Sequence, residues 1–240
     1  MSSQQEGKKE KVKSMFNDIA PKYDLLNHVL SMGIDKLWRK KVRKQLAEIK
    51  PERILDIATG TGDLAIELAK LNPKEIIGAD IAVDMLKVGE KKIKKKGLDH
   101  IIKLEQGDAE NLKYDTDYFD AVTVAFGVRN YENLLKGLKE MHRVLRPGGK
   151  VAILEFSKPS SFPIKNIYNF YFKNILPNIG KKVSKNDEAY TYLPESVQQF
   201  PEGRDFMNVM KQAGYTQIGQ TRLSFGIATL YTGLKKRKKA

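Results

Sequence analysis

Short apolar runs alternate with segments of helical periodicity along most of this chain, and this alternation limits the possible folds more than any other feature. Five runs have a strand-like composition, at residues 53–57, 75–80, 101–106, 119–126 and 150–156. The segments between them repeat apolar side chains at helical spacing. Strands joined by such helices pair in parallel, because each helix crosses over the sheet before the next strand begins. The sequence therefore predicts an α/β fold with a parallel sheet flanked by helices.

The two ends of the chain extend this core. Residues 34–49 repeat apolar side chains at helical spacing up to Pro51, which predicts an amphipathic helix laid on the core. Residues 215–222 and 226–234 predict an antiparallel pair that finishes the sheet. We interpret the chain as one domain, 1–240, with four parts: a helical cover (1–50), a cofactor-binding core (51–158), an inserted helical segment (159–200) and a C-terminal helix, strand pair and basic tail (201–240).

Composition narrows the class of protein and its partners. The 240 residues include no cysteine and three histidines, which excludes thiolate catalysis and leaves little for a metal site, so we expect no metal. Lysine and arginine outnumber the acidic residues by 43 to 29, and the net charge of +14 predicts attraction to nucleic acid or to an anionic membrane face. No apolar run approaches the ~20 residues of a spanning helix. We expect a cytoplasmic protein whose membrane contact is peripheral, at the inner face, and whose polar start (1–13) and basic finish (235–239) are frayed.

A glycine-rich turn follows the first predicted strand. Residues 58–63 read Ala-Thr-Gly-Thr-Gly-Asp and lead into a helical segment at 64–69. Gly60 and Gly62 would let the backbone approach a ligand beside the N–H groups of that helix. Asp80 ends the second strand, where an acid that binds ribose hydroxyls is expected. Both a dinucleotide and S-adenosylmethionine are compatible with this pattern.

Charge separates these two cofactors. Asp56 ends the first strand and Asp63 begins the following helix, around the position that a dinucleotide pyrophosphate would take. At about 4 Å and an effective dielectric near 20, each contact between like charges costs about 4 kcal/mol before screening. S-adenosylmethionine carries a cationic ammonium and sulfonium instead, so the sequence favours this methyl donor. The alternative is that the two aspartates only cap the helix.

Later segments add candidate groups and one structural turn. Asp108 follows the third strand and is suited to an adenine edge, although a simple turn explains it equally well. Residues 146–149, Arg-Pro-Gly-Gly, are typical of a helix stop before the strand at 150–156. His142, in the helix before that stop, is expected at the surface. The candidate ligand groups all follow strands, at the edge where open α/β sheets bind ligands.

Four segments resemble the S-adenosylmethionine-dependent methyltransferases that C-methylate prenylated quinols. They are Tyr-Asp-Leu-Leu-Asn at 23–27 with Leu30, Ser31 and Trp38; Phe-Gly-Val-Arg-Asn at 126–130; residues 143–149 leading to Glu155, Phe156 and Ser157; and residues 190–197 with Phe200 and Pro201. Leu26, Asp35 and Arg146 stand where the family usually has Met, His and Lys. The resemblance implies the class I methyltransferase fold: doubly wound and Rossmann-like, with a mostly parallel seven-stranded sheet and a final antiparallel strand. It implies S-adenosylmethionine as the cofactor, a loop shaped by Gly60 and Gly62, and contacts from Thr61, Asp80, Asp108 and Ala109; our charge argument adds Asp56.

The resemblance also implies a reaction and a substrate. The acceptor would be a ring carbon of a prenylated naphthoquinol in menaquinone synthesis, or of a benzoquinol in ubiquinone synthesis. Catalysis would consist of orientation and of stabilising the quinolate oxygen. Arg129 suits that second role, and Asn130 and Tyr190, together with Tyr192, suit the ring hydroxyls. A salt bridge that fixes the loop is the alternative for Arg129, and core packing for the tyrosines.

The inserted segment contains a second informative pattern. Apolar residues from Ile164 to Leu176 recur at i, i+3, i+4 and i+7, and Lys181 and Lys182 follow. Such an amphipathic helix could lie on an anionic bilayer and admit the polyprenyl tail. A helix that covers the sheet edge, or a homodimer contact, explains the pattern as well.

Two other functions compete with quinol methylation. Methylation of RNA would suit the charge of +14, but the basic residues are scattered and no RNA-binding module is recognisable, so we expect no nucleic-acid partner. A non-catalytic scaffold for quinone-synthesis enzymes would not need the intact acidic glycine loop.

Overall fold

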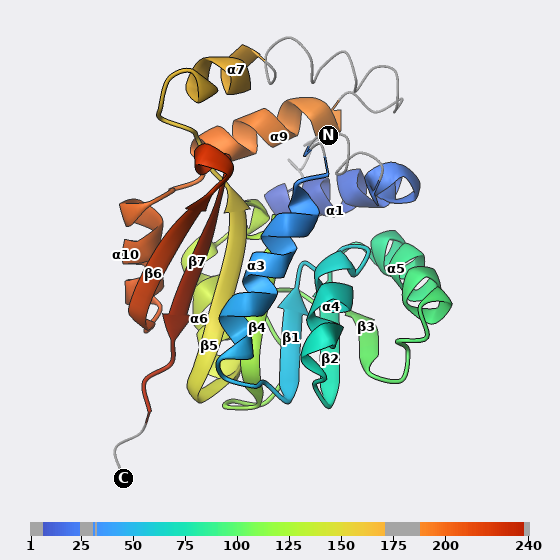
Figure 1. Cartoon of the computed structure of the whole chain (residues 1–240). Coiled ribbons are helices and arrows are strands. Elements are labelled where there is room, and N and C mark those ends of the chain that lie inside the picture. Colours follow the sequence, from blue (N-terminus) through green and yellow to red (C-terminus); the bar gives the residue numbers. More distant parts are fainter. Residues whose placement is uncertain (1–6, 25–30, 32, 171–187, 238–240) are drawn as a thin grey trace, which may run out of the picture.

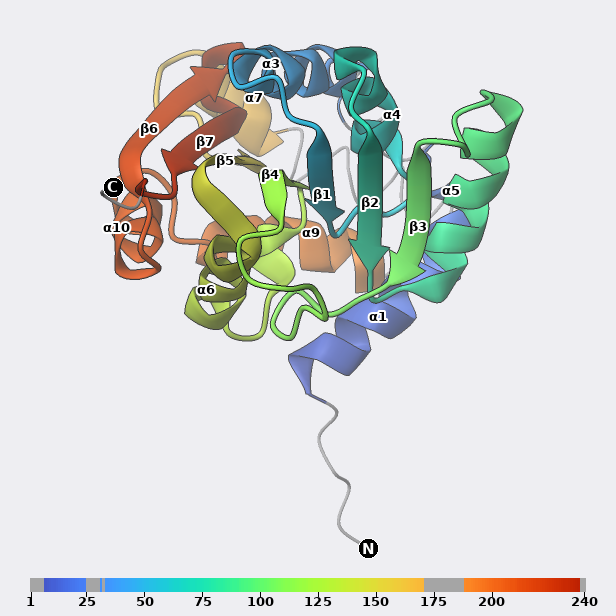
Figure 2. The same cartoon turned by 90° about the horizontal axis from the view of Figure 1, so that it is seen from below.

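The computed structural model of the chain describes residues 7–24, 31, 33–170 and 188–237. Within these residues, seven strands form one sheet in the order β3-β2-β1-β4-β5-β7-β6 (Figures 1 and 2). Neighbouring strands run parallel except β7, which is antiparallel to both β5 and β6. The predicted doubly wound, mostly parallel sheet is confirmed. Its strands are β1 (Arg53–Ile57), β2 (Glu75–Asp80), β3 (Ile102–Gln106), β4 (Phe119–Ala125), β5 (Leu145–Phe156), β6 (Thr216–Leu223) and β7 (Ala228–Leu234).

Helices cover both faces of the sheet. On one face lie α3 (Asp35–Ala47), α4 (Asp63–Leu68) and α5 (Val83–Lys95), with the short η2 (Ala69–Leu71) after α4. On the other lie α6 (Leu134–Val144) and α10 (Arg204–Gln212). Successive strand residues point to opposite faces, so a strand covered on both sides is apolar throughout. The continuous apolar runs seen in the sequence follow from this arrangement.

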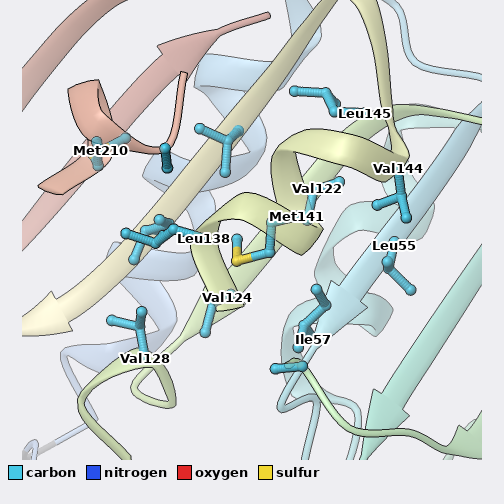
Figure 3. Close-up of a cluster of buried hydrophobic side chains, with 14 of the residues drawn as sticks. Leu55, Ile57, Val122, Val124, Val128, Leu138, Met141, Val144, Leu145 and Met210 are labelled. Atoms are coloured by element: carbon cyan, nitrogen blue, oxygen red, sulfur yellow. The ribbon is translucent and has the colours of Figure 1, made fainter. Parts of the chain in front are cut away.

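Two hydrophobic cores result. Leu55 and Ile57 of β1 belong to one buried cluster with Leu138 and Met141 of α6, and Met210 of α10 lies at the far side of that cluster (Figure 3). On the opposite face, Ile54 packs beneath α3 and α4, among the buried side chains Trp38, Val42, Leu46, Leu64 and Leu68. Burial of each large side chain stabilises the fold by about 1.5–3 kcal/mol. The cores therefore hold the strand ends of the sheet in fixed positions.

A third group of elements lies over the edge where the parallel strands end. It contains α1 (Lys8–Ile19), η1 (Ala20–Lys22), η3 (Val128–Asn130), α7 (Ile164–Phe170) and α9 (Glu188–Gln199). Figure 1 shows α1, α7 and α9 together at this upper edge, where the turn η5 (Ser224–Gly226) also joins β6 to β7. The second half of the predicted amphipathic helix, 171–176, and Lys181 and Lys182 lie outside the described residues. Among those described, no helix combines the length and the apolar character needed to cross a bilayer.

Helix α6 ends at Val144, just before the predicted stop at residues 146–149, but the structure corrects the predicted start of the next strand. Strand β5 begins directly after α6, at Leu145, and includes this segment. Leu145 pairs with Phe119, and the register then shifts before Ala121 pairs with Lys150, so the Pro-Gly-Gly segment forms an irregularity inside the strand. Gly148 has a φ of +82° and donates its N–H to the carbonyl of Lys235. A glycine with left-handed φ inside a strand is typical of such a bulge.

Both chain ends are more ordered than predicted. Lys8 begins α1, in which Val12, Met15 and Ile19 are buried. Lys235, at the start of the basic run, donates to the carbonyls of His142 and Arg143 and pairs with Asp117 at 2.7 Å. His142 is half-buried against the ring of Tyr215, so the prediction of a surface position was wrong. Burial lowers the pKa of this histidine, helped by the nearby Lys235 charge.

Candidate active site

The glycine loop after β1 is held from below by a buried aspartate. Asp56 is 1% exposed, and its two carboxylate oxygens accept hydrogen bonds from Thr59 and Thr123, both at 2.7 Å. Thr123 is the β4 residue that pairs with Asp56 in the sheet. Burial raises the pKa of Asp56 to about 6, although the two hydroxyl donors act in the opposite direction. Asp56 therefore joins the strand, the loop and the neighbouring strand behind the pocket wall.

The loop itself requires unusual backbone angles. Ala58, Gly60 and Gly62 all have positive φ, of 51°, 56° and 78°. A Cβ on Gly60 would lie 3.1 Å from the Met85 methyl, so the absence of a side chain at Gly60 leaves space between the loop and Met85 at the pocket. A Cβ on Gly127, in the loop after β4, would lie 2.4 Å from the Cβ of Ala58. The two loops thus touch, and side chains larger than hydrogen would push them apart.

Asp80 lies at the end of β2, directly beside this loop. Its Oδ2 accepts the Gly60 N–H at 2.8 Å and its Oδ1 accepts the Ala82 N–H at 2.9 Å. Burial raises the pKa of Asp80 above its ordinary value, against the effect of these backbone donors. The carboxylate keeps further lone pairs, because each oxygen can accept more than one hydrogen bond. It is therefore positioned to accept hydroxyl donors from a ligand in the pocket.

A pocket opens between the ends of β1, β2 and β4 and the helix α1. It has about 670 Å³ of empty space, including its open mouth. Its described lining carries four carboxylates and one ammonium group: Asp80, Asp108, Glu110, Glu132 and Lys9. Phe16, Tyr23, Phe126 and Tyr131 contribute apolar and aromatic surface. The excess of negative charge suits a cationic ligand and disfavours a pyrophosphate.

Helix α1 forms one wall of the pocket and belongs to the predicted helical cover at 1–50. Lys9 pairs with Asp108 at 2.8 Å, and Lys8 donates to the carbonyls of Arg129 and Tyr131 at 3.0 and 2.9 Å. Burial would raise the pKa of Asp108, but the hydrogen bonds from Lys9 and from the Glu110 N–H outweigh it and lower that pKa. The signal was present in the sequence, because Val12, Met15 and Ile19 follow the i, i+3, i+7 spacing of a helix with one apolar face.

An ion-pair network lies behind the loop, on the side away from the pocket. Lys92 of α5 contacts Asp24 and Asp63 at 2.6 Å each and the Thr61 hydroxyl at 2.9 Å. Asp63 also pairs with Arg39 at 3.0 Å. Our expectation that Asp63 flanks the ligand is corrected by these contacts, since cations from α3 and α5 already neutralise it. The acidity of the pocket comes from later strand ends instead.

The predicted cofactor residues divide into two groups. Gly60, Asp80, Asp108 and Ala109 line the pocket. The other group lies behind the pocket wall and consists of Asp56, Thr61 and Gly62. Asp56 accepts hydrogen bonds from two other threonines, Thr61 donates to Asp24 at 2.5 Å, and Gly62 is the N-cap of α4. Contact between the cofactor and these residues stays a prediction. We interpret the second group as shaping the loop that the first group uses.

The predicted catalytic residues lie on the side of the pocket nearer β4 and β5. Arg129 forms a buried ion pair with Glu155 at 2.7 Å, and it also donates to the Phe126 carbonyl and to Ser196. This is the loop-fixing salt bridge weighed as the alternative from the sequence. Asn130 lines the pocket and accepts a hydrogen bond from the Tyr192 hydroxyl at 3.0 Å. Tyr190 belongs to α9, and its side chain is outside the described part of the chain.

These groups fit S-adenosylmethionine. The Gly60 cradle admits a ligand close to the backbone, and Asp80 offers carboxylate oxygens for ribose hydroxyls. Asp108, with the adjacent backbone at Gly107 and Ala109, suits the exocyclic amine of an adenine. The acidic lining suits the ammonium and sulfonium groups. The ribose, the adenine and the cationic groups of the cofactor thus each have a matching surface among the described residues.

The comparisons agree with this interpretation. The chain is 47% identical over 232 residues to the demethylmenaquinone methyltransferase of Bacteroides fragilis, which covers 96% of this chain and 95% of that protein. It is 44% identical to the ubiquinone/menaquinone biosynthesis C-methyltransferase UbiE of a Geobacter species, over 95% of this chain and 97% of that one. Among solved structures, an S-adenosylmethionine-dependent methyltransferase of Thermotoga maritima shares the fold, with a TM-score of 0.64, 19% identity, and 93% and 99% of the two chains covered.

The family assignment follows from the length of these matches together with the loop geometry. The family model matches residues 4–235, which extend from the start of α1 to the end of β7. It includes the glycine loop, the pocket lining and the α9 segment. The resemblance drawn from four sequence segments is thereby confirmed, and the chain belongs to the ubiE/COQ5 methyltransferase family.

Proposed function

We propose that this enzyme transfers a methyl group from S-adenosylmethionine to the ring carbon of demethylmenaquinol, giving menaquinol. The observation that carries the proposal is the acidic glycine-loop pocket, with Asp80 and Asp108 at neighbouring strand ends, in a chain of this family. The relative at 47% identity is named for this reaction. A benzoquinol acceptor is the alternative, since the Geobacter relative is named for both quinone pathways.

On the donor side, the chain's own groups bind and orient. When bound, S-adenosylmethionine supplies the electrophilic methyl group. Asp80 fixes the ribose end, and it holds the loop in place because it also binds the Gly60 and Ala82 N–H groups. Asp108 fixes the adenine end beside Lys9. Helix α1 closes the pocket and reduces the access of water to the reacting atoms.

On the acceptor side, the ring lies between aromatic walls. Phe126, Tyr131 and Asn130 line the pocket, beside the loop after β4. Tyr192 uses the Asn130 side-chain oxygen, and the amide nitrogen of Asn130 has no hydrogen-bond acceptor among the described residues, so it is able to donate to a quinol oxygen. With the hydroxyl proton lost to water, the neighbouring ring carbon would be nucleophilic and would form a bond to the methyl group as the methyl–sulfur bond breaks, with S-adenosylhomocysteine as the leaving group. Loss of the proton on that ring carbon would then restore the aromatic quinol. Arg129 positions the Phe126–Asn130 segment through its bonds to Glu155 and to the Phe126 carbonyl.

The substrate class requires access to a membrane. A polyprenylated quinol resides in the bilayer, and the chain has a net charge of +14 that attracts it to anionic headgroups. We therefore propose a peripheral enzyme that works at the membrane surface.

Quinone profiles test the proposed acceptor. A menaquinone-producing strain that lacks its own methyltransferase should accumulate demethylmenaquinone, and expression of this chain should convert it to menaquinone. A strain blocked at the ubiquinone C-methylation step tests the benzoquinol alternative in parallel. Mass spectrometry of lipid extracts measures the quinones of both strains. If both profiles stay blocked while the protein is present and folded, the proposed function is wrong.

A further inference from the structure

One corner of the molecule, at the sheet edge that carries the pocket, exposes large apolar side chains. Large apolar side chains are rarely left in water unless they have a partner. Phe162 is 82% exposed, Phe225 is 80% exposed and Leu37 is 58% exposed. The three residues lie far apart in the sequence, before α7, in η5 and in the first turn of α3. We call these three side chains the apolar corner.

Specific contacts bring the three residues to one place. The Trp38 indole N–H donates to the Ser224 hydroxyl at 2.9 Å, which ties the Leu37 turn to the Phe225 turn. Arg222 donates to Ser160 and to the Lys158 carbonyl at 3.2 and 3.3 Å, which ties the segment before Phe162 to the same turn. Figure 1 shows the β6–β7 turn beside α7 and α9 at the upper edge of the sheet. The corner is therefore built by tertiary contacts.

The backbone holds Phe225 outward. Ser224, Phe225 and Gly226 have φ values of 46°, 58° and 93°, three successive left-handed residues. A bulky residue in this region is strained, and such strain persists only where the surrounding contacts impose it. An asparagine or glycine at 225 would relieve the strain and would remove the exposed ring. The chain instead keeps a phenylalanine ring in water at a position where its backbone is least favourable.

Positive charge surrounds the corner. Lys36 and Lys40 are exposed on α3 beside Leu37, Lys165 is exposed on α7, and Arg222 is exposed at the end of β6. Apolar side chains with a basic rim are typical of surfaces that insert into an anionic bilayer, where the rings enter the acyl boundary and the cations meet the headgroups.

The corner is joined rigidly to the pocket. Trp38 packs on Phe156 and Phe126, with ring centroids 6.1 and 5.9 Å away, and those two phenylalanines stack at 4.4 Å. Phe126 is itself part of the pocket lining. A surface that contacts the corner is therefore held at a fixed position relative to the pocket.

We propose that the apolar corner is the bilayer-docking surface of this enzyme and that its occupant is an anionic lipid membrane. This inference rests on the proposed function, because a lipid-soluble quinol explains why the pocket edge would face a bilayer. Docking through Phe225, Phe162 and Leu37 places the pocket edge at headgroup level, where the quinol ring of a tail-anchored substrate is found. A second copy of the chain, or a protein partner, would be a different occupant.

Vesicle flotation with the full chain tests the surface. The probe is a vesicle of phosphatidylglycerol and phosphatidylcholine. Wild-type protein should float with it, and Phe225→Asn with Leu37→Ser should lower the vesicle partition coefficient about tenfold or more, the factor that burial of one such side chain supplies. Asparagine tolerates positive φ, so the variant should keep its thermal unfolding midpoint. Lys36→Glu should also weaken flotation, whereas Lys44→Glu, at the opposite end of α3, should not.

Other results would overturn the proposal. Wild-type protein that does not float, or a corner variant that floats as well as wild type, would overturn it. So would a wild-type protein that is a dimer while the corner variant is a monomer. Methylation of a water-soluble demethylmenaquinol analogue with a single isoprene unit is measured without vesicles in parallel. The corner variant should retain this activity. If wild type floats but never methylates the analogue, the proposed function fails and the docking surface stands.

Discussion

At the scale of single residues, the pocket depends on carboxylates whose oxygens already have partners in the chain. Asp80 accepts two backbone N–H groups and Asp56 accepts two hydroxyls, while Asp63 pairs with two cations. All three stand in one short stretch of sequence and look alike there. Their neighbours in space separate them into a pocket-lining acid, a loop anchor and an ion-pair partner. Only the first lines the pocket.

Replacing Asp80 with asparagine should weaken binding of S-adenosylmethionine. Both oxygens of the carboxylate accept a backbone N–H, so an amide NH₂ would face a donor on one side and would lose hydroxyl contacts on the other. Hydrogen bonds to a charged group contribute about 1.5–3 kcal/mol, which predicts about a 10- to 150-fold rise in Kd by calorimetry. Asp84→Asn, an exposed carboxylate at the start of α5, is the matched control. Unchanged affinity in Asp80→Asn would remove this residue from the cofactor site.

The buried Asp56 predicts a pH dependence of stability. Its pKa is raised to about 6 in the fold, so the folded state holds the proton more tightly than the unfolded chain. Protonation of Asp56 therefore adds to the free energy of unfolding below about pH 4, and this contribution is lost as the pH rises through about 6. Asp56→Asn removes this effect. Urea unfolding gives the free energy of unfolding of both proteins. The value for Asp56→Asn minus that for wild type should rise by about 3 kcal/mol between about pH 4 and pH 7. A difference that is independent of pH would contradict the assignment.

At the scale of elements, two clusters hold the loops around the pocket. Lys92 connects α5 to the start of α4 and to Asp24. Arg129 and Glu155 connect η3 to the end of β5, and Ser196 extends this cluster to α9. Both clusters consist of charged groups from segments far apart in the sequence. Helical periodicity and loop composition carry no information about such pairs, which is why the sequence indicated Asp63 as a ligand group and left Lys92 unnoticed.

Replacing Lys92 with methionine should loosen the glycine loop. The change leaves Asp24, Asp63 and the Thr61 hydroxyl without their shared cation, at a partly buried position. We expect a loss of about 1–3 kcal/mol in the free energy of unfolding and weaker cofactor binding. Lys87→Met breaks an exposed pair on the same helix and should cost less than about 1 kcal/mol. Equal losses for the two variants in chemical denaturation would show that the network adds nothing.

Arg129 can be tested separately as an anchor and as a group that acts on substrate. Arg129→Met leaves Glu155, which is fully buried, without its cation, and breaking such a pair costs about 3–5 kcal/mol. Adding Glu155→Gln removes the buried charge and should restore part of the stability. If Arg129 only positions the loop, the double variant should also regain much of kcat. Restored stability with kcat still reduced at least a hundredfold would assign Arg129 to the quinolate oxygen.

At the scale of the whole molecule, the sequence predicted the fold and the family better than the function of each site residue. Alternation of strand and helix patterns indicated the five strands β1 to β5, because strands buried on both faces of a sheet require continuous apolar runs. Two β-rich runs near the end of the chain indicated β6 and β7, of which β6 is largely exposed. The start of β5 was placed five residues late, since Pro-Gly-Gly is typical of a stop and here forms a bulge. Helix α1 was taken as a frayed end because its lysines mask a narrow apolar face. Their partners, Asp108 and two carbonyls, become visible only in three dimensions.

The molecule has an acidic pocket and an apolar corner with a basic rim at one edge of its sheet. The pocket explains the choice of a cationic methyl donor. The corner explains how a protein with no described spanning helix would reach a substrate dissolved in lipid. The two features are joined through Trp38, Phe156 and Phe126, so the pocket and the corner form one rigid unit. On our proposal, this unit meets the membrane at its pocket edge.

Transfer of a labelled methyl group tests this account most directly. Purified protein is incubated with S-adenosylmethionine labelled at the methyl carbon and with chemically reduced demethylmenaquinone in lipid vesicles, and the products are identified by mass spectrometry. We predict one label on the naphthoquinone ring for each S-adenosylhomocysteine released, and loss of both products in Asp80→Asn. Cofactor that binds while the reduced quinone stays unlabelled would contradict the account.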